Sequence, residues 1–217
     1  MIQFENVTAT YADDAGIFDL SFLIEKGEMV FLMGPTGAGK STILRTIYKD
    51  IELNDGSLYI DEVDVTYMKR RKIPYYRRRI GMIFQDFRLL QDRTVFQNVA
   101  LPLHIVGLNS KIIKSQVNSI LEKVGLDGVK NMLPHQLSGG EQQRVSIARA
   151  LVKNPIIILA DEPTGNLDPN IADDILDLLE LATNNGTTVL MSTHNFPLVR
   201  PRKKRFIELN NGRLVQR

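Results

Sequence analysis

The chain has 217 residues, of which 43% are hydrophobic and 24% charged, and its formal net charge is +2. These proportions are ordinary for a folded protein, and the length is enough for one large domain or two small ones. The sequence contains no cysteine, which excludes disulfides, thiolate metal sites and cysteine nucleophiles.

The first residues are predicted to form strands. Ile2, Gln3 and Phe4 alternate in polarity, and residues 22–24 form a short apolar run that ends at a Lys-Gly-Glu turn. Residues 1–5 lack the basic and apolar regions of a signal peptide, so none is expected. The apolar runs 29–33 and 156–160 are far shorter than the roughly 20 residues of a membrane-spanning helix. The chain is therefore not expected to cross a membrane.

A glycine-rich loop follows the predicted strand 29–33. Its sequence matches the phosphate-binding pattern G-x-x-x-x-G-K-[ST]: Gly34-Pro35-Thr36-Gly37-Ala38-Gly39-Lys40-Ser41. Glycines let successive backbone N–H groups point at phosphate oxygens, where a side chain would collide. Lys40 can reach the β- and γ-phosphates, Ser41 can ligate Mg²⁺, and the helix expected at 41–48 adds its N-terminal dipole. A strand, this loop and a helix predict a nucleoside triphosphate site.

Lysine and arginine are concentrated in two blocks, at 69–79 and 200–205. We interpret each block first as a solvated surface and second as a surface that works against an anionic membrane. A nucleic-acid site is the third interpretation, because no aromatic interleaving or recognised binding module accompanies the charge. Direct binding of nucleic acid is therefore not expected.

The rest of the chain alternates between strand and helix patterns. Strands are predicted at 58–61, 156–160, 187–191 and 206–209, and an amphipathic helix at 171–182. A helical pattern runs from about 95 to 152. This order predicts an α/β fold with a mainly parallel sheet covered on both faces, interrupted by a helical insert at about 86–150.

A second anion site is predicted in the octapeptide 137–144, Leu-Ser-Gly-Gly-Glu-Gln-Gln-Arg. Ser138, Gly139 and Gly140 open a helix, so their free N–H groups and the serine hydroxyl can hold a phosphate. Ser138 and Glu141 also fit a capping box, which is an ordinary helix start. The two interpretations are compatible, because a well-capped helix end is also a rigid phosphate donor.

Two carboxylates follow the predicted strand 156–160. Acidic residues at the carboxyl end of a parallel strand lie where α/β sheets bind ligands. Asp161 is placed to hold Mg²⁺, and Glu162 is placed to orient or deprotonate an attacking water. By themselves, two acidic residues after a strand would indicate an ordinary solvated turn. Together with the phosphate loop, Asp161 and Glu162 predict a hydrolytic site.

These motifs together resemble the ATPase domains of the ABC family, in order and in spacing, over nearly the whole chain. The resemblance implies a P-loop NTPase core, an N-terminal antiparallel β subdomain and a helical subdomain within a single domain covering 1–217. It also implies a head-to-tail, ATP-dependent homodimer with two ATP and Mg²⁺ between the subunits. The nucleotide contacts that the resemblance implies are Tyr11, residues 34–41, Thr42, Gln85, Ser138, Gly139, Gly140, Glu141 and Asp168.

Within that family, the resemblance assigns roles to individual residues. Tyr11 matches the aromatic residue that stacks on adenine, and Gln85 matches the residue that links Mg²⁺ to the helical insert. The implied catalytic residues are Lys40, Gln85, Glu162 and His194, and the implied metal ligands are Ser41, Gln85 and Asp161. Residues 165–168 resemble the loop that passes between the two active sites.

The sequence departs from the family beyond His194. Aspartate is usual at the next position, which here is Asn195. Pro197 and Pro201 interrupt the helix that usually follows, so a full helix is not expected there.

Four stretches resemble the group of ABC ATPases that acts with an integral membrane partner in bacterial cell division: 77–86, 89–95, 98–103 and 160–168. The resemblance implies a peripheral protein on the cytoplasmic face of the bacterial inner membrane, at the division site, whose ATP-driven motion regulates cell-wall hydrolases. ATPases of lipoprotein-release and macrolide-type exporters share much of this pattern and are the alternative. Asp86 and the run 92–95 favour the cell-division group.

The segment 86–103 is where the partner helix docks in this family. Five apolar residues there could line a groove for it: Phe87, Leu89, Leu90, Phe96 and Val99. The alternative is that about half of them pack the core of the insert.

Overall fold

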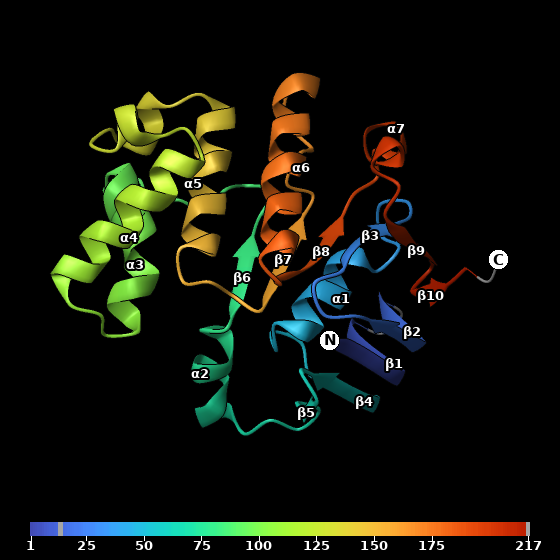
Figure 1. Cartoon of the computed structure of the whole chain (residues 1–217). Helices are drawn as coiled ribbons and strands as arrows, with labels where there is room; N and C mark the ends of the chain where they lie inside the picture. Colours follow the sequence, from blue (N-terminus) through green and yellow to red (C-terminus); the bar gives the residue numbers. More distant parts are fainter. Residues whose placement is uncertain (13–14, 216–217) are drawn as a thin grey trace.

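A computed structural model describes residues 1–12 and 15–215 (Figure 1). The first of its two sheets is antiparallel, with the strand order β2-β1-β4-β5. Its strands are β1 (Ile2–Ala12), β2 (Ala15–Ile24), β4 (Asp55–Ile60) and β5 (Val63–Asp64). This sheet confirms the antiparallel N-terminal part of the predicted fold. β1 and β2 are longer than the short apolar runs indicated, because their outer residues face solvent and break the apolar pattern.

The second sheet has the order β10-β9-β3-β8-β7-β6 and is parallel except at one edge. Its parallel strands are β3 (Met29–Met33), β6 (Ile80–Ile83), β7 (Ile157–Asp161), β8 (Thr188–Ser192) and β9 (Arg205–Asn210), and β10 (Arg213–Leu214) closes the edge. β3, β7 and β8 are apolar along almost their whole length, as expected for strands covered on both faces.

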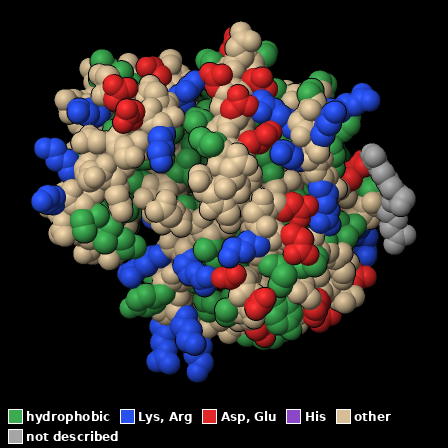
Figure 2. All heavy atoms as spheres, in the orientation of Figure 1, with side chains coloured by type: hydrophobic (Ala, Val, Ile, Leu, Met, Phe, Trp, Pro, Cys, Tyr) green, Lys and Arg blue, Asp and Glu red, His purple; other side chains and the backbone are tan. Residues whose placement is uncertain are grey.

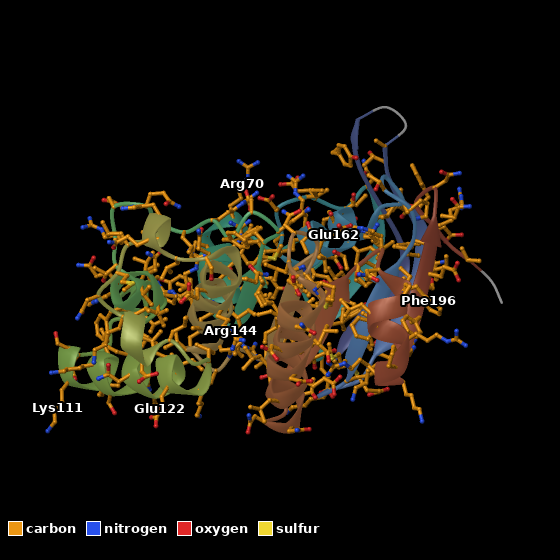
Figure 3. The ribbon with its side chains drawn as sticks, turned by 90° about the horizontal axis from the view of Figure 1, so that it is seen from above. Arg70, Lys111, Glu122, Arg144, Glu162 and Phe196 are labelled. Carbon is orange, nitrogen blue, oxygen red and sulfur yellow. The ribbon has the colours of Figure 1, made fainter. Side chains whose placement is uncertain are left out.

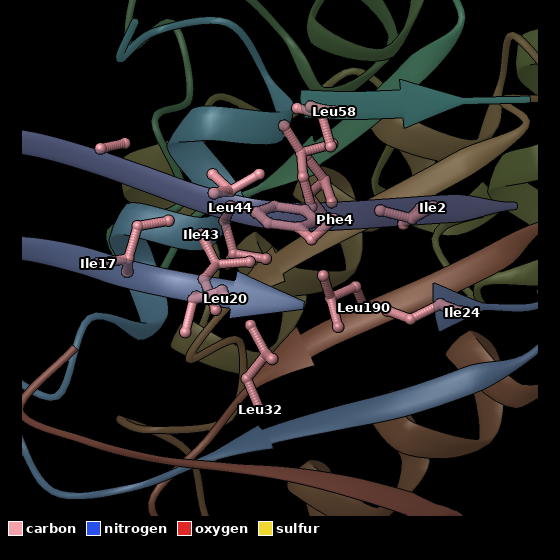
Figure 4. Packing of buried hydrophobic residues seen from close by; sticks show 14 of the residues in the cluster. Ile2, Phe4, Ile17, Leu20, Ile24, Leu32, Ile43, Leu44, Leu58 and Leu190 are labelled. Carbon is pink, nitrogen blue, oxygen red and sulfur yellow. The ribbon is translucent and has the colours of Figure 1, made fainter. Parts of the chain in front are cut away.

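Alternate residues of these strands enter two separate cores. Leu32, Leu159 and Leu190 face the antiparallel sheet and α1 (Lys40–Ile47), as the packing in Figure 4 shows for Leu32 and Leu190. Phe31 and Ile158 point the opposite way, toward α6 (Pro169–Asn184). Because side chains alternate across a strand, one apolar run can serve both cores. The phosphate loop before α1 is thereby fixed between two packed layers.

The chain between β6 and β7 forms a helical layer with a core of its own (Figure 1). Its helices are α3 (Val95–Ile105), α4 (Ser110–Lys123), η2 (Asp127–Val129), η3 (Pro134–Gln136) and α5 (Gly139–Leu151). α3 begins at a capping box formed by Thr94 and Gln97. α3 and α5 pack against each other, and α5 also contacts β6, so the layer is joined directly to the parallel sheet.

Short helical turns occupy two further segments. η1 (Arg70–Lys72) and α2 (Ile73–Arg77) lie between β5 and β6, while α7 (Phe196–Val199) and η4 (Arg200–Arg202) follow β8. The helix after His194 ends after one turn, as the prolines at 197 and 201 predicted. None of the helices in the described ranges is long and apolar enough to span a bilayer.

Candidate active site

The loop 34–41 has a backbone conformation that only glycine adopts easily, as two of its positions show. Gly39 has φ +98°, and Gly34 has φ +146° with the carbonyl oxygen of Leu209 only 2.3 Å from where a Cβ would stand. The Lys40 side chain is 5% exposed, and its Nζ donates to the carbonyl oxygens of Gly34 at 2.8 Å and Pro35 at 3.0 Å. The ammonium group therefore lies inside the loop, at the N-terminus of α1, where an anion is stabilised.

Asp161 lies at the end of β7, where it connects the loop to the parallel sheet. Ser41 Oγ donates to Asp161 Oδ1 at 2.9 Å, and Ser192 Oγ donates to the same oxygen at 2.7 Å. Asp161 and Ser192 are direct partners in the β7–β8 register. Two hydroxyls thus hold the same carboxylate oxygen. The Ser41 hydroxyl and an Asp161 oxygen therefore lie side by side at the edge of the loop.

Glu162 is the next residue, and its carboxylate lies between two cationic or basic groups. One oxygen is 3.7 Å from Lys40 Nζ, and the other is 2.9 Å from His194 Nδ1. The Glu162 backbone has φ +45°, an uncommon value for a non-glycine residue, and its N–H donates to the Ser192 carbonyl and hydroxyl oxygens. Only 18% of the Glu162 side chain is exposed, against 57% for His194. In Figure 3 Glu162 lies at the centre of the molecule.

Gln85, just beyond β6, reaches the same region. Its Nε2 would be 3.4 Å from a Cβ placed on Gly165, and a carboxylate oxygen of Glu162 would be 3.7 Å from the same point. The structure therefore brings Lys40, Ser41, Gln85, Asp161, Glu162 and His194 together, from four separate parts of the chain. Asn195 N-caps α7 by accepting from the Leu198 N–H at 3.2 Å, so the departure from the usual aspartate retains a capping side chain.

Ser138 begins α5 as the capping box predicts. Its Oγ accepts from the Glu141 N–H at 3.3 Å, and both its N–H and its hydroxyl donate to the Glu141 carboxylate. These hydrogen bonds, first from the hydroxyl and then from the N–H, lower the pKa of the Glu141 carboxyl. Gly140 packs against Ile171, whose Cγ2 would be 2.8 Å from a Cβ at that position. In Figure 1 the start of α5 lies apart from α1, with α6 between them.

The loop between Glu162 and α6 joins this helix to the rest of the site. Asp168 caps α6 by accepting from the Asn170 N–H at 3.3 Å. Gln143, which is fully buried on α5, donates to the Pro163 carbonyl oxygen at 2.7 Å. Neither Gln143 nor Ser192 was identified from the sequence. The signal for Ser192 was its position at the end of a strand next to β7; Gln143 lies within a polar run and carried no signal.

Tyr11 lies on the β1–β2 hairpin and is 62% exposed. The hairpin register pairs Thr10 with Gly16, and the carbonyl oxygen of Gly16 would be 3.2 Å from a Cβ on Gly39. Gly16 of β2 is therefore adjacent to the phosphate loop, and the Tyr11 side chain on the paired strand is largely in solvent.

The five apolar residues expected to line a partner groove lie mostly in the core of the helical layer. Leu89 and Val99 are buried in the core of the helical layer, and Phe87 and Phe96 are partly buried against it, so four of the five proposed residues belong to that core. A hollow of about 310 Å³ lies nearby, lined by Tyr48, Ile80, Gly81, Met82, Phe84, Arg88, Leu90, Leu101, Pro102, Arg149, Ala150 and Lys153. Of the original five, only Leu90 lines it. The error arose because the apolar pattern of 86–103 does not distinguish the inner from the outer face.

The charged residues in this hollow are all cationic. Arg149 donates to the carbonyl oxygens of Phe87 and Arg88, which ties α5 to the segment after Gln85. Lys153 donates to the Arg77 carbonyl oxygen at 3.0 Å, and burial lowers the pKa of Lys153 to about 8.

The shift at Lys153 predicts a pH-dependent stability. Between pH 8 and pH 10.5 the unfolded chain keeps a proton that folded Lys153 has lost, so this residue makes the free energy of unfolding rise with pH. Lys153→Met should remove that rise and should be stabilised relative to wild type below pH 8. Urea unfolding across this range measures both. Lys111→Met, on an exposed lysine of α4 (Figure 3), is the control and should follow the wild-type profile. Parallel profiles for wild type and Lys153→Met would contradict the assignment.

Residues 17–165 match the ABC transporter family. The chain is 47% identical over 218 residues to the cell division ATP-binding protein FtsE of Mycobacterium tuberculosis, covering 100% of this chain and 95% of that protein. It is 48% identical over 216 residues to the protein of the same name from Escherichia coli K12, covering 99% and 97%. Both similarities extend over essentially complete chains.

Solved structures give the same result for the fold. The dimeric structure of MJ0796, described as a bacterial ABC transporter cassette, superposes with a TM-score of 0.90 at 37% identity, covering 100% of this chain and 97% of that one. A dimeric post-hydrolysis state of the same cassette, bound to ADP and Pi, gives 0.89 at 36% identity with the same coverage. The α/β fold with a P-loop core is thereby confirmed.

Proposed function

The chain belongs to the ABC transporter family, in its FtsE group of ATP-hydrolysing cassettes, and on that premise we propose that it drives an FtsE–FtsX-like membrane complex. The observation that supports hydrolysis at this site is the position of Glu162, between Lys40 and His194 at the carboxyl end of β7. Glu162 acts as the general base toward the attacking water, because its carboxylate is held beside Lys40, which is expected to meet the γ-phosphate. His194 holds that carboxylate and contacts the γ-phosphate.

Residues 34–41 and Thr42 bind the phosphates of ATP, and Tyr11 stacks on the adenine. Lys40, now bonded to two loop carbonyls, turns to the β- and γ-phosphates. The donor set fits Mg²⁺: Ser41 and Asp161 offer a hydroxyl and a carboxylate at the phosphate loop, and Gln85 supplies an amide oxygen nearby. The described residues hold no group of three or more His, Cys, Asp and Glu side chains that could bind a metal ion. Mg²⁺ usually keeps several water ligands and is bound through one or two carboxylates and phosphates. When bound, Mg²⁺ neutralises charge on the phosphates.

We infer that the second anion site, at the start of α5, binds the nucleotide of a partner subunit. Ser138, Gly139 and Gly140 begin a helix that contacts residues 163–171 of the same chain, and the contacts given for these glycines in the described ranges include none with the phosphate loop. We infer a head-to-tail homodimer in which this turn, with Glu141, closes on the ATP held by the other chain, and Asp168 lies between the two sites. A related cassette is described as dimeric, which supports this arrangement.

The partner that this ATPase moves is an integral membrane protein, which docks in the hollow lined by Tyr48, Phe84 and Leu101. Arg149 joins that hollow to α5, and Gln143 joins α5 to the loop after Glu162, so a change at the nucleotide can move the docked helix. The expected output is regulation of cell-wall hydrolysis in division, from the cytoplasmic face of the inner membrane. Export remains the second candidate, because the similar cassette MJ0796 is described as that of a transporter.

The membrane partner can be identified by co-purification. The tagged Glu162→Gln chain, held in its ATP-bound state, is expected to retain an FtsX-like membrane protein from detergent-solubilised membranes. Leu101→Glu, which places a charge in the hollow, is the matched variant and should lose that protein while keeping its ATP turnover. Recovery of an exporter subunit instead would replace cell division by export.

A further inference from the structure

The two basic blocks of the sequence have different environments in the folded chain. In the block 200–205, the central arginine, Arg202, contacts three carboxylates of α6, and its neighbours Lys204 and Arg205 are also paired: the acids are Asp173, Asp177, Glu180 and Glu28. Most of this charge is neutralised within the chain. The sequence could not show this, because the acids are contributed by distant elements.

The block 69–72 is exposed and largely unpaired. Lys69, Arg71 and Lys72 form no salt bridge with any residue of the described ranges. Arg70 lies 3.7 Å from Glu52, but both side chains are more than four-fifths exposed, where an ion pair contributes little. Figure 2 shows Lys and Arg side chains projecting from the lower edge of the molecule, where Figure 1 places α2, and Figure 3 shows Arg70 pointing away from the ribbon.

Aromatic rings flank these cations, contrary to what the sequence alone suggested. Tyr67 is 79% exposed and Tyr75 is 65% exposed, which is unusual for large aromatic side chains. Arg78 lies 4.7 Å from the centre of the Tyr75 ring, and its buried Nε has no hydrogen-bond partner. Exposed tyrosines beside cations are typical of surfaces that meet an interface between water and hydrocarbon.

Two adjoining hollows lie directly beside the charge, and the first is mainly apolar. One of about 310 Å³ is formed mainly by Val63, Met68 and Tyr75, and its only charged residues are the cations Lys72 and Arg79. A second, of about 360 Å³, shares Val63, Met68 and Lys72 with the first and is more polar, because Asp64, Lys69 and Arg71 also line it. A ligand that fits both features is anionic at one point and hydrocarbon immediately next to it.

We propose that the lipid patch, defined as Tyr67, Lys69, Arg71, Lys72 and Tyr75, binds the headgroups of an anionic phospholipid bilayer. The cations attract the phosphates, and the tyrosines and hollows receive the adjoining glycerol and acyl carbons. A nucleic-acid strand would instead need a basic groove along which bases stack in succession, whereas the first hollow here is lined mainly by apolar side chains.

The lipid patch adjoins the proposed partner groove. Arg77 follows it on α2 and lies 4.5 Å from the ring of Tyr48, which lines the groove, and Lys153 of the groove donates to the Arg77 carbonyl oxygen. The inference rests on the proposed function in this respect only: a membrane protein in the groove would bring the patch to the bilayer. The patch would then help to fix the orientation of the ATPase beneath the membrane.

Vesicle co-sedimentation of the purified full-length chain tests the proposal. Wild type is expected to bind vesicles of mixed phosphatidylglycerol and phosphatidylcholine, and not vesicles of phosphatidylcholine alone. Lys69→Gln, Arg71→Gln and Lys72→Gln combined should weaken this binding roughly 100-fold. The matched control removes the same charge from the other block, with Arg200→Gln, Lys203→Gln and Lys204→Gln, and should bind as wild type does. Both triple variants should hydrolyse ATP at the wild-type rate.

Three results would overturn the proposal while leaving the ATPase assignment intact. Equal losses in the two triple variants would mean that net charge alone determines binding. Vesicle binding that is unchanged after Tyr67→Ser and Tyr75→Ser, at a salt concentration that screens the cations, would show that the tyrosines contribute nothing to binding. Binding of duplex DNA that the first triple variant loses in parallel would assign the patch to nucleic acid. If the wild-type chain did not hydrolyse ATP at all, that result would instead contradict the proposed function.

Discussion

Replacement of Glu162 by Gln is expected to lower ATP turnover by about 100- to 10,000-fold, the range that a positioned general base contributes. Glutamine keeps the shape of the side chain and can still contact His194, but its amide cannot take a proton from water. ATP binding should persist, because the phosphate loop and Lys40 are unchanged. The variant should therefore accumulate as an ATP-dependent dimer, which size exclusion with and without ATP will detect.

The control for this prediction is Glu28→Gln. Glu28 resembles Glu162 in its environment, with 24% of its side chain exposed and Arg205 at 3.5 Å, but it lies outside the site. This variant should turn over ATP as wild type does. If Glu162→Gln hydrolysed ATP at the wild-type rate, the base would have to be another group, and His194 would be the first to test.

The parts of this site that could be predicted are those encoded by consecutive residues. The loop 34–41 carries its own glycines and lysine. Ser138 and Glu141 form a cap between residues three positions apart, so both were identified together. The end of the helix after His194 followed from two prolines for the same reason. Local patterns were sufficient because backbone preference and short-range hydrogen bonds determine these features.

The parts that could not be predicted depend on contacts between distant residues. Ser192 holds Asp161 only because β7 and β8 pair in one particular register. Val99 and Leu101 are both apolar residues of α3, yet one is fully buried and the other lines the groove. The central arginine of the block 200–205 meets carboxylates of α6, whereas Lys69, Arg71 and Lys72 meet none in the described ranges. In each case the deciding partner is far away in the chain.

Lys40→Ala is expected to weaken ATP binding itself, by roughly 30- to 150-fold in Kd, which corresponds to the loss of about 2–3 kcal/mol from hydrogen bonds to a charged ligand. The ammonium group is the only side-chain cation among the residues 34–41, and it is already held inside the loop by the carbonyl oxygens of Gly34 and Pro35. Loss of this group leaves the backbone N–H groups and the α1 dipole to hold the phosphates alone. Calorimetric titration with ATP under conditions that prevent turnover measures the change.

Lys49→Ala separates this loss from general damage to the fold. Lys49 is 8% exposed and donates from Nζ to the Thr66 carbonyl oxygen at 2.9 Å, so it matches Lys40 in burial and in the kind of bond it makes. It lies beyond the end of α1, away from the loop. Both variants should lose comparable stability on thermal unfolding, and only Lys40→Ala should lose ATP affinity. An unchanged Kd in Lys40→Ala would mean that its ammonium group serves the loop carbonyls and not the nucleotide, whereas equal losses in both variants would trace the effect to the fold.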